Sequence, residues 1–288
     1  MSRDFLILIF AALSAVNLYS QSQGPFQSFQ DRKSFADFLF CKGDYSRAAS
    51  EYECISGFEN NDSLFLKLGY SYLQVNNSKL AGLMVNKIRD SAQAEQLQGS
   101  IIMKHFTDGE YLKVLSLSDS LNKKAQTGQK SYIPISYFSS ILSGQTLQGN
   151  FQLSIVSSNE TDTINFLVNK VVRPEKKSEL TAGLLSAVIP GAGKIYTGKT
   201  GDGITTFLIT GLMTFLTVDN FSRNHSFRGY VFGVSTILFY GGSIYGSAAS
   251  AQLMNEENER SARNQLADFV KLNEFLHPKT FNPGSVCK

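Results

Sequence analysis

The residue pattern in this chain that could do chemistry lies between Gly193 and Thr200. The segment Gly193-Lys194-Ile195-Tyr196-Thr197-Gly198-Lys199-Thr200 satisfies the spacing G-x-x-x-x-G-K-[ST]. In that motif backbone amides surround the phosphates of a nucleotide, the lysine contacts the terminal phosphates and the hydroxyl binds magnesium. The apolar run Leu184–Ile189 stands where such a loop needs a strand. One hypothesis is therefore a nucleotide hydrolase with Gly193, Gly198, Lys199 and Thr200 in its phosphate-binding loop.

The surroundings of this motif favour a different interpretation. Gly201-Asp202-Gly203 follows Thr200 and indicates a loop, where a helix N-terminus should receive the phosphate. The chain beyond Thr200 is largely hydrophobic, whereas each crossover unit of a parallel sheet needs about 30 residues of alternating strand and helix patterns. We therefore expect no bound nucleotide and no other cofactor.

No other group of residues points to catalysis. The three histidines, His105, His225 and His277, do not stand beside a plausible nucleophile in the sequence, and with only three Cys a multi-ligand metal site is not expected. The net charge is +3 without a long Lys/Arg cluster, so no footprint for nucleic acid is visible. We expect a protein that is not an enzyme and binds neither metal nor nucleic acid.

The elements that position this segment come from the distribution of charge. Charged residues are 18% of the 288 residues, and they are absent from Gly203–Val218 and Gly229–Asn255. At 1.5 Å per residue the second run is long enough to cross a hydrocarbon core of about 30 Å, whereas the first is short and needs flanking residues. The sequence predicts two transmembrane helices, at about 203–221 and 229–250, packed as a hairpin. The alternative is a buried soluble helical hairpin.

The N-terminus has the layout of a secretory signal peptide. Arg3 precedes the uncharged run Phe5–Val16, and the polar stretch Asn17–Gln23 follows. We expect a cleaved signal over residues 1–22; an uncleaved anchor or a buried helix are the alternatives. Export would permit disulfides.

The cysteines do not pair by local geometry. Cys41 and Cys54 flank an expected helix turn at Gly43-Asp44, which places them about 10 Å apart along the helix axes. A disulfide needs Cα atoms about 4.4–6.8 Å apart. We therefore expect Cys41 and Cys54 to be small core residues, and Cys287 to be a tail thiol without a partner.

The polar half of the chain contains an internal repeat. Turn-like triplets recur at spacings of about 33 to 40 residues, and apolar residues between them fall at helical spacing. The triplets are Gly43-Asp44-Tyr45, Asn76-Asn77-Ser78, Gly109-Glu110-Tyr111 and Gly149-Asn150-Phe151. Such a period predicts stacked helix-turn-helix units.

These units resemble tetratricopeptide repeats. The first unit matches with Gly43, Tyr45 and Ala48, and the second with Gly69, Tyr72 and Ala81; the third, around Gly109 and Tyr111, fits loosely because His105 and Val114 replace an aromatic and a small residue. The resemblance implies that a protein partner binds a concave groove. The alternative is an irregular helical domain without true repeats.

A second resemblance covers the segment around the glycine-rich motif. Pro190, Gly191, Gly193, Tyr196 and Gly198, followed by Asp202-Gly203, resemble the signature of a bacterial membrane family of unknown function, in which two transmembrane helices follow and some members carry N-terminal repeats. Lys194 departs from the glutamine often found there. We expect Pro190 and the glycines to break an interfacial helix, Tyr196 to lie at headgroup level and Asp202-Gly203 to turn the chain into the bilayer. The segment could equally be only a turn and an anchor.

The sequence thus predicts an all-α protein with a tetratricopeptide-like solenoid followed by a transmembrane helical hairpin. Its expected parts are a signal peptide (1–22), repeats (31–170), a linker (171–180), an interfacial segment with two transmembrane helices (181–250) and a tail (251–288) that begins with an amphipathic helix.

The expected function is that of an adaptor in the bacterial envelope. The hairpin anchors it in the inner membrane, the repeats bind a protein partner in the periplasm, and the loop 219–228 faces the cytoplasm because of its arginines. Besides the nucleotide hydrolase, the alternative is an assembly or insertion factor whose hairpin contacts membrane proteins directly.

Overall fold

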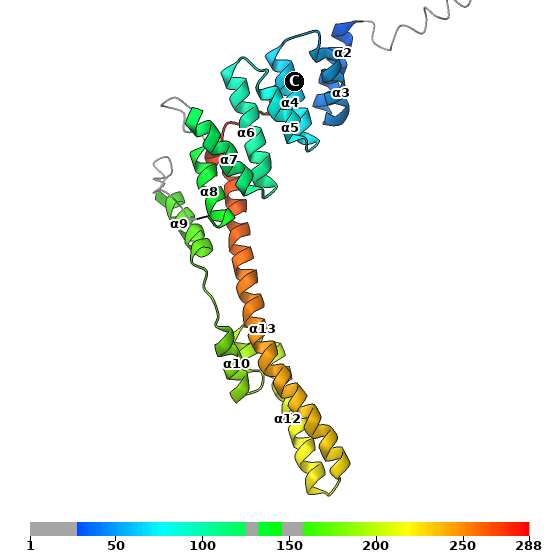
Figure 1. The fold of residues 1–288 in the computed structure, drawn as a ribbon, viewed down its shortest axis with the longest axis vertical. Helices are drawn as coiled ribbons and strands as arrows, with labels where there is room; N and C mark the ends of the chain where they lie inside the picture. Colours follow the sequence, from blue (N-terminus) through cyan, green and yellow to red (C-terminus); the bar gives the residue numbers. More distant parts are fainter. Residues whose placement is uncertain (1–27, 125–131, 146–157, 288) are drawn as a thin grey trace, which may run out of the picture. The chain divides into compact units, whose positions relative to one another are not determined.

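The computed structural model describes residues 28–124, 132–145 and 158–287, and the regular structure of these residues is entirely helical (Figure 1). The predicted all-α class is confirmed. The predicted signal peptide and the predicted turn at Gly149 lie outside the described residues. The described chain forms two compact units: unit 1 comprises the described residues of 28–143 with 273–287, and unit 2 comprises 144–145 and 158–272.

Unit 1 begins with three helix pairs that correspond to the first three predicted repeats. The helices are α2 (Phe29–Cys41), α3 (Tyr45–Ser56), α4 (Asp62–Gln74), α5 (Ser78–Val85), α6 (Ser91–Thr107), α7 (Tyr111–Lys124) and the additional α8 (Ile133–Ser143). The three predicted turns lie between α2 and α3, α4 and α5, and α6 and α7. In each of these turns a residue with positive φ follows the end of the first helix of the pair. These residues are Gly43, Asn76 and Gly109.

Hydrogen bonds repeat in these turns at equivalent positions. The residue after each positive-φ residue donates its N–H to a carbonyl five residues earlier, which satisfies an otherwise unpaired helix carbonyl. The bonds are Asp44 to Leu39 at 2.9 Å, Asn77 to Tyr72 at 2.8 Å and Glu110 to His105 at 2.9 Å. The turns that recur about every 33 residues in the sequence therefore have the same hydrogen-bonding pattern in the structure.

The predicted repeat positions lie at helix contacts. Ala48 and Ala81 are fully buried, as is Val114 at the equivalent position of the third pair. A Cβ on Gly69 would lie 2.5 Å from Cδ2 of Leu97, so α4 and α6 approach closely there. The aromatic positions recur too, since the rings of Tyr45 and Tyr111 pack edge-on against Phe40 and Phe106, with centroids 5.5 and 5.4 Å apart.

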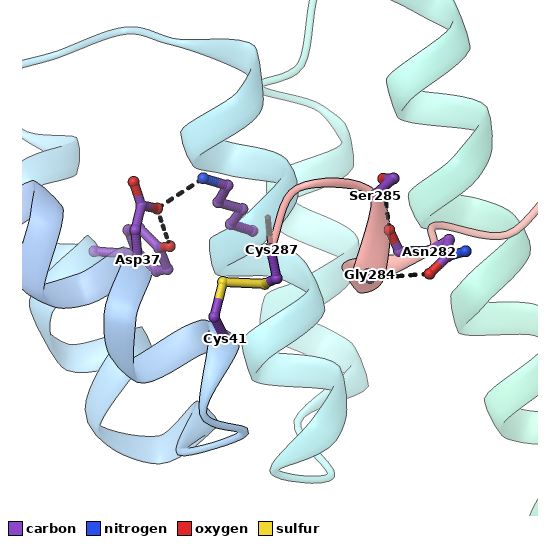
Figure 2. Close-up of a disulfide and its surroundings, with 8 residues drawn as sticks. Asp37, Cys41, Asn282, Gly284, Ser285 and Cys287 are labelled. Carbon is purple, nitrogen blue, oxygen red and sulfur yellow. Dashed lines mark hydrogen bonds and ion pairs between the residues drawn. A yellow bond between two sulfur atoms is a disulfide. The ribbon is translucent and has the colours of Figure 1, made fainter.

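The C-terminal segment corrects the cysteine prediction. Cys41 and Cys287 form a disulfide, although their sequence separation is 246 (Figure 2). Cys54 is free and exposed rather than a core residue. Cys41 and Cys54 are not bonded to each other, but the predictions that Cys41 and Cys287 have no partner are wrong, because the two residues meet from opposite ends of the chain.

Residues 278–287, which we call the tail segment, cross the first helix of every pair in unit 1. On α6, a Cβ at Gly99 would lie 2.0 Å from the carbonyl oxygen of Lys279, and Phe281 donates its N–H to Oγ of Ser100 at 2.9 Å. The ring of Phe281 then packs against Tyr70 of α4 and Phe40 of α2, at centroid distances of 5.2 and 6.3 Å. The disulfide at Cys41 fixes its end to α2. The tail segment is thus part of the core of unit 1.

Unit 2 contains the apolar half of the chain. Its helices are α9 (Ser158–Val172), α10 (Glu179–Val188), α11 (Ala192–Tyr196), α12 (Thr200–Ser222) and α13 (Ser226–Leu272). Although α9 falls within the predicted repeat region, it packs on α13, where Lys170 donates to Gln265 at 2.9 Å. The predicted boundary at 250/251 is absent, because α13 is a single helix of 47 residues that joins the predicted second span to the predicted tail helix.

Helix α12 is, within the described residues, the one helix long and apolar enough to cross a membrane. Its 23 residues extend about 35 Å. We expected the second apolar segment to be the better span, but glycines, serines and tyrosines lower the hydropathy of α13. The two helices pack antiparallel (Figure 1), with Thr217 and Thr236 hydrogen-bonded at 3.3 Å.

The buried contact at Ala81 can be tested by overpacking. We expect Ala81→Phe to lower the free energy of unfolding by about 1–3 kcal/mol, because Ala81 has no exposed surface. The neighbouring Gly82→Phe is the matched control, since a Cβ there meets nothing within 4 Å. Thermal unfolding of the full chain in detergent measures both; equal midpoints for the two variants would contradict the packing described.

The disulfide should stabilise unit 1 through the tail segment. We expect Cys287→Ser to cost about 2–4 kcal/mol, because the loop that the bond closes is long. Cys54→Ser removes an exposed, unbonded thiol and should change little. Denaturant unfolding followed by tyrosine fluorescence measures the difference, and a Cys287→Ser protein as stable as Cys54→Ser would count against the bond.

Candidate functional site

The predicted motif residues come together where α10, α11 and the start of α12 meet α13. We call this contact the glycine-serine junction; it consists of Gly191, Gly193 and Gly203 with the buried Ser186, Ser243 and Ser247. It lies within unit 2, and each of its glycines was predicted from the sequence.

The turn before α11 explains Pro190 and Gly191. Ile189 ends α10 in an extended conformation, with φ −130° and ψ 113°, as a residue before proline prefers. Gly191 has φ +86°, which other residues rarely adopt. A Cβ on Gly191 would also lie 2.1 Å from the carbonyl oxygen of Gly203. Both the backbone angle and the contact with α12 therefore require glycine.

The other two glycines permit close helix contacts. A Cβ on Gly193 would lie 1.9 Å from the carbonyl oxygen of Ala182 and 2.7 Å from Cβ of Ser247. A Cβ on Gly203 would lie 2.5 Å from Cγ1 of Ile195. The backbone of α11 at Gly193 therefore packs directly on α10 and α13, and the backbone of α12 at Gly203 packs on α11. A larger residue at either glycine would force these helices apart.

Buried hydroxyl groups supply the polar contacts of the junction. Ser243 Oγ accepts the Gly191 N–H at 2.9 Å, and Ser186 Oγ accepts that of Gly193 at the same distance. Ser186 and Ser247 are hydrogen-bonded to each other at 2.6 Å. These bonds satisfy groups that would otherwise be costly to bury.

Sequence reasoning missed these serines. Ser243, Ser247 and Ser250 recur at helical spacing on one face of α13, and Ser250 is hydrogen-bonded to Thr197 at 3.0 Å. Their spacing within an apolar run was the signal that could have identified them. They were overlooked because serine is tolerated in apolar helices without a specific role.

Tyr196 packs against the predicted linker. Its hydroxyl accepts the Ser178 N–H at 3.4 Å, and Nζ of Lys177 lies 4.8 Å from its ring centroid. Asn255 of α13 fixes the same stretch, because its side chain accepts from the Lys177 N–H at 2.8 Å and donates to the Lys177 carbonyl at 2.9 Å. The linker is therefore held on α13.

The stretch after α11 differs from the prediction. Gly198, with φ +82°, ends α11, and Lys199 donates its N–H to the Lys194 carbonyl at 2.8 Å. The predicted loop at Gly201-Asp202-Gly203 is wrong, since α12 already begins at Thr200. Asp202 lies in its first turn, where a carboxylate is favourable because the helix dipole is positive there.

The segment does not have the geometry of a phosphate-binding loop. Helix α10 precedes it instead of a strand, and residues Ala192–Tyr196 are themselves helical. The backbone amides that would surround a phosphate donate to carbonyls within the segment; they belong to Lys194, Ile195, Thr197, Gly198 and Lys199. The Lys199 side chain is exposed. Of the four predicted residues, Gly193 packs in the glycine-serine junction, whereas Gly198, Lys199 and Thr200 connect α11 to α12 and are exposed.

No group of three potential metal ligands occurs within the described ranges. His105 is buried in α6 and hydrogen-bonded to Glu110 at 2.5 Å. Comparisons of the chain with protein families, curated proteins and solved structures give no match. The two resemblances noted in the sequence therefore stay predictions.

We expect substitution of Gly193 to disturb assembly of the protein and substitution of Lys199 to have little effect. Gly193→Val should reduce the amount of assembled protein in membranes by about tenfold, because its side chain would overlap Ala182 and Ser247. Lys199→Ala should be close to neutral, since this side chain is exposed. Immunoblotting of membrane fractions measures both. A Lys199→Ala protein that inserts normally but fails in complementation would restore the nucleotide hypothesis.

Proposed function

We propose that this protein is a membrane-anchored adaptor without catalytic activity, whose repeats lie outside the cytoplasm and bind a protein partner. The observation that carries the proposal is the tail segment, which follows the apolar helices in the chain and yet is bonded to α2 through Cys41. The proposal has three parts: compartment, topology and binding.

The compartment follows from redox chemistry. Disulfides persist in oxidising environments such as the periplasm and are rare in the reducing cytosol. A bond between Cys41 and Cys287 therefore supports an extracytoplasmic unit 1. This agrees with the signal peptide predicted over residues 1–22.

The topology follows from the same bond. Cys41 precedes α12 and Cys287 follows α13, so an even number of membrane crossings must separate them. If α12 crosses a bilayer, a second segment must bring the chain back. The first half of α13 is antiparallel to α12 and free of charge from Gly229 to Asn255, which supports this role.

The surface of unit 2 supports burial in lipid. Only 6% of the apolar window of α12 is buried. Large apolar side chains are exposed along α10, α12 and the first half of α13; they include Leu184, Val188, Phe207, Leu212, Phe215, Val234 and Ile237. Soluble monomers rarely expose so extensive an apolar surface. The turn with Arg223 and Arg228 then faces the cytoplasm, as positively charged loops prefer.

The proposed binding role is supported by the way the helices of unit 1 bind the tail segment of the same chain. The tail segment runs across α6, α4 and α2, where the ring of Phe281, one hydrogen bond from its backbone N–H and the disulfide fix it. Stacked helix pairs characteristically build such extended surfaces. We infer that a second surface of the same unit takes up a partner.

The exposed Cys54 and the turn after α12 provide a topology test. In intact cells a membrane-impermeant maleimide should label Cys54, which is exposed in unit 1. In a Cys54→Ser background, Asn224→Cys should react only after the inner membrane is opened, while the bonded Cys41 and Cys287 serve as unreactive internal controls. Labelling of Asn224→Cys from the periplasm would contradict the proposal.

A further inference from the structure

Unit 1 has an open groove on a side that the tail segment does not occupy. The groove has a volume of about 400 Å³ and lies between α5, α6 and α7. On α6 it is lined by Gln98 and Ile101, whereas the tail segment contacts Gly99 and Ser100 on another side of that helix. The volume falls in the range of small-ligand pockets, and suits a few residues of an extended peptide.

The groove combines an apolar floor with a positive rim. Val85 and Ile101 are buried at its base, and Lys79 and Lys113 stand on α5 and α7 at its sides. None of the described residues that line it is acidic. The groove therefore complements a ligand that carries both apolar groups and negative charge.

The two lysines differ in how far their charge is already compensated. Lys113 donates to Glu110 at 2.7 Å, and this bond, together with His105, holds the pKa of the Glu110 carboxyl below its usual range. Lys79 forms no ion pair within the described part of the chain. Lys79 is thus the charge available to a ligand.

The internal repeat shows why the groove opens at this place. Val85 and Gln98 occupy the positions of Tyr52 and Phe65 one repeat earlier, both of which are buried aromatic residues. The groove is thus lined by a smaller and a polar side chain at positions where the preceding repeat has buried aromatic residues.

The charge at the equivalent positions changes as well. The first repeat has Glu53, which accepts a hydrogen bond from Tyr72, and the second has the neutral Asn86. Leu80 in α5 corresponds to Lys113 in α7. The groove therefore has a neutral amide and an ammonium group at positions where the equivalent residues one repeat earlier are a carboxylate and a leucine.

We propose that this groove binds an extended acidic segment of the partner protein, with an apolar side chain on Val85 and Ile101 and a carboxylate beside Lys79. This deepens the proposed adaptor function and rests on it for the presence of a partner. The tail segment is not the ligand, because it is bound on the other side of α6.

Peptide binding to the full chain in detergent tests this proposal. The probe is a short fluorescein-labelled peptide of alternating leucine and glutamate, and its counterpart carries lysine in place of glutamate. Fluorescence anisotropy should show binding of the acidic peptide alone, weakened by salt. Lys79→Glu should weaken binding about tenfold or more through charge repulsion. Gly82→Phe should abolish binding by filling the groove, where a Cβ meets nothing within 4 Å.

Two matched variants outside the groove distinguish loss of the binding site from a general effect of the charge change or of the added ring. Lys42→Glu makes the same charge change on an exposed residue after α2, and Gly57→Phe adds the same ring at another position without close neighbours. Both should bind like the unmodified protein. Absence of binding, equal binding of the lysine peptide, or unchanged binding in Lys79→Glu and Gly82→Phe would overturn the groove proposal. The adaptor topology is measured independently by labelling of Cys54 and Asn224→Cys.

Discussion

The attachment of the tail segment to the first helices of the three pairs is the constraint on which the rest of the structure depends. Phe281 packs into the aromatic cluster with Phe40 and Tyr70, and the bond from Cys287 to Cys41 closes the chain on itself. Everything between these ends is thereby required to begin and finish in one compartment. If α12 crosses a bilayer, as we propose, a second segment must therefore bring the chain back.

The glycine-serine junction holds the helices of unit 2 together by close packing and buried hydrogen bonds. Glycines at Gly191, Gly193 and Gly203 let the short helix α11 and the turn before it approach α10, α12 and α13 closely. The buried Ser243 of α13 and Ser186 of α10 accept the amides of Gly191 and Gly193. Packing and hydrogen bonding of this kind do not depend on a hydrophobic driving force, which is weak between helices within lipid. This contact accounts for Gly193 of the phosphate-loop-like motif, and Gly198 with its positive φ accounts for the end of α11.

Sequence reasoning succeeded where the signal was local. The turns at Gly43, Asn76 and Gly109 follow from residue types that favour positive φ, and the motif glycines follow from their unusual density. It failed where the determinant was distant or ambiguous. Nothing near Cys287 indicates Cys41 as its partner, and Gly201-Asp202-Gly203 is as compatible with a turn as with the first turn of α12.

The pairing of the cysteines in the protein as isolated from cells tests the common compartment of the two chain ends most directly. Free thiols are alkylated in intact membranes, the protein is digested without reduction, and the peptides are identified by mass spectrometry. The account predicts a peptide that joins Cys41 to Cys287, with Cys54 alone alkylated. Alkylated Cys287, or Cys41 bonded to any other thiol, would contradict the common compartment of the two ends and the return of the chain through α13.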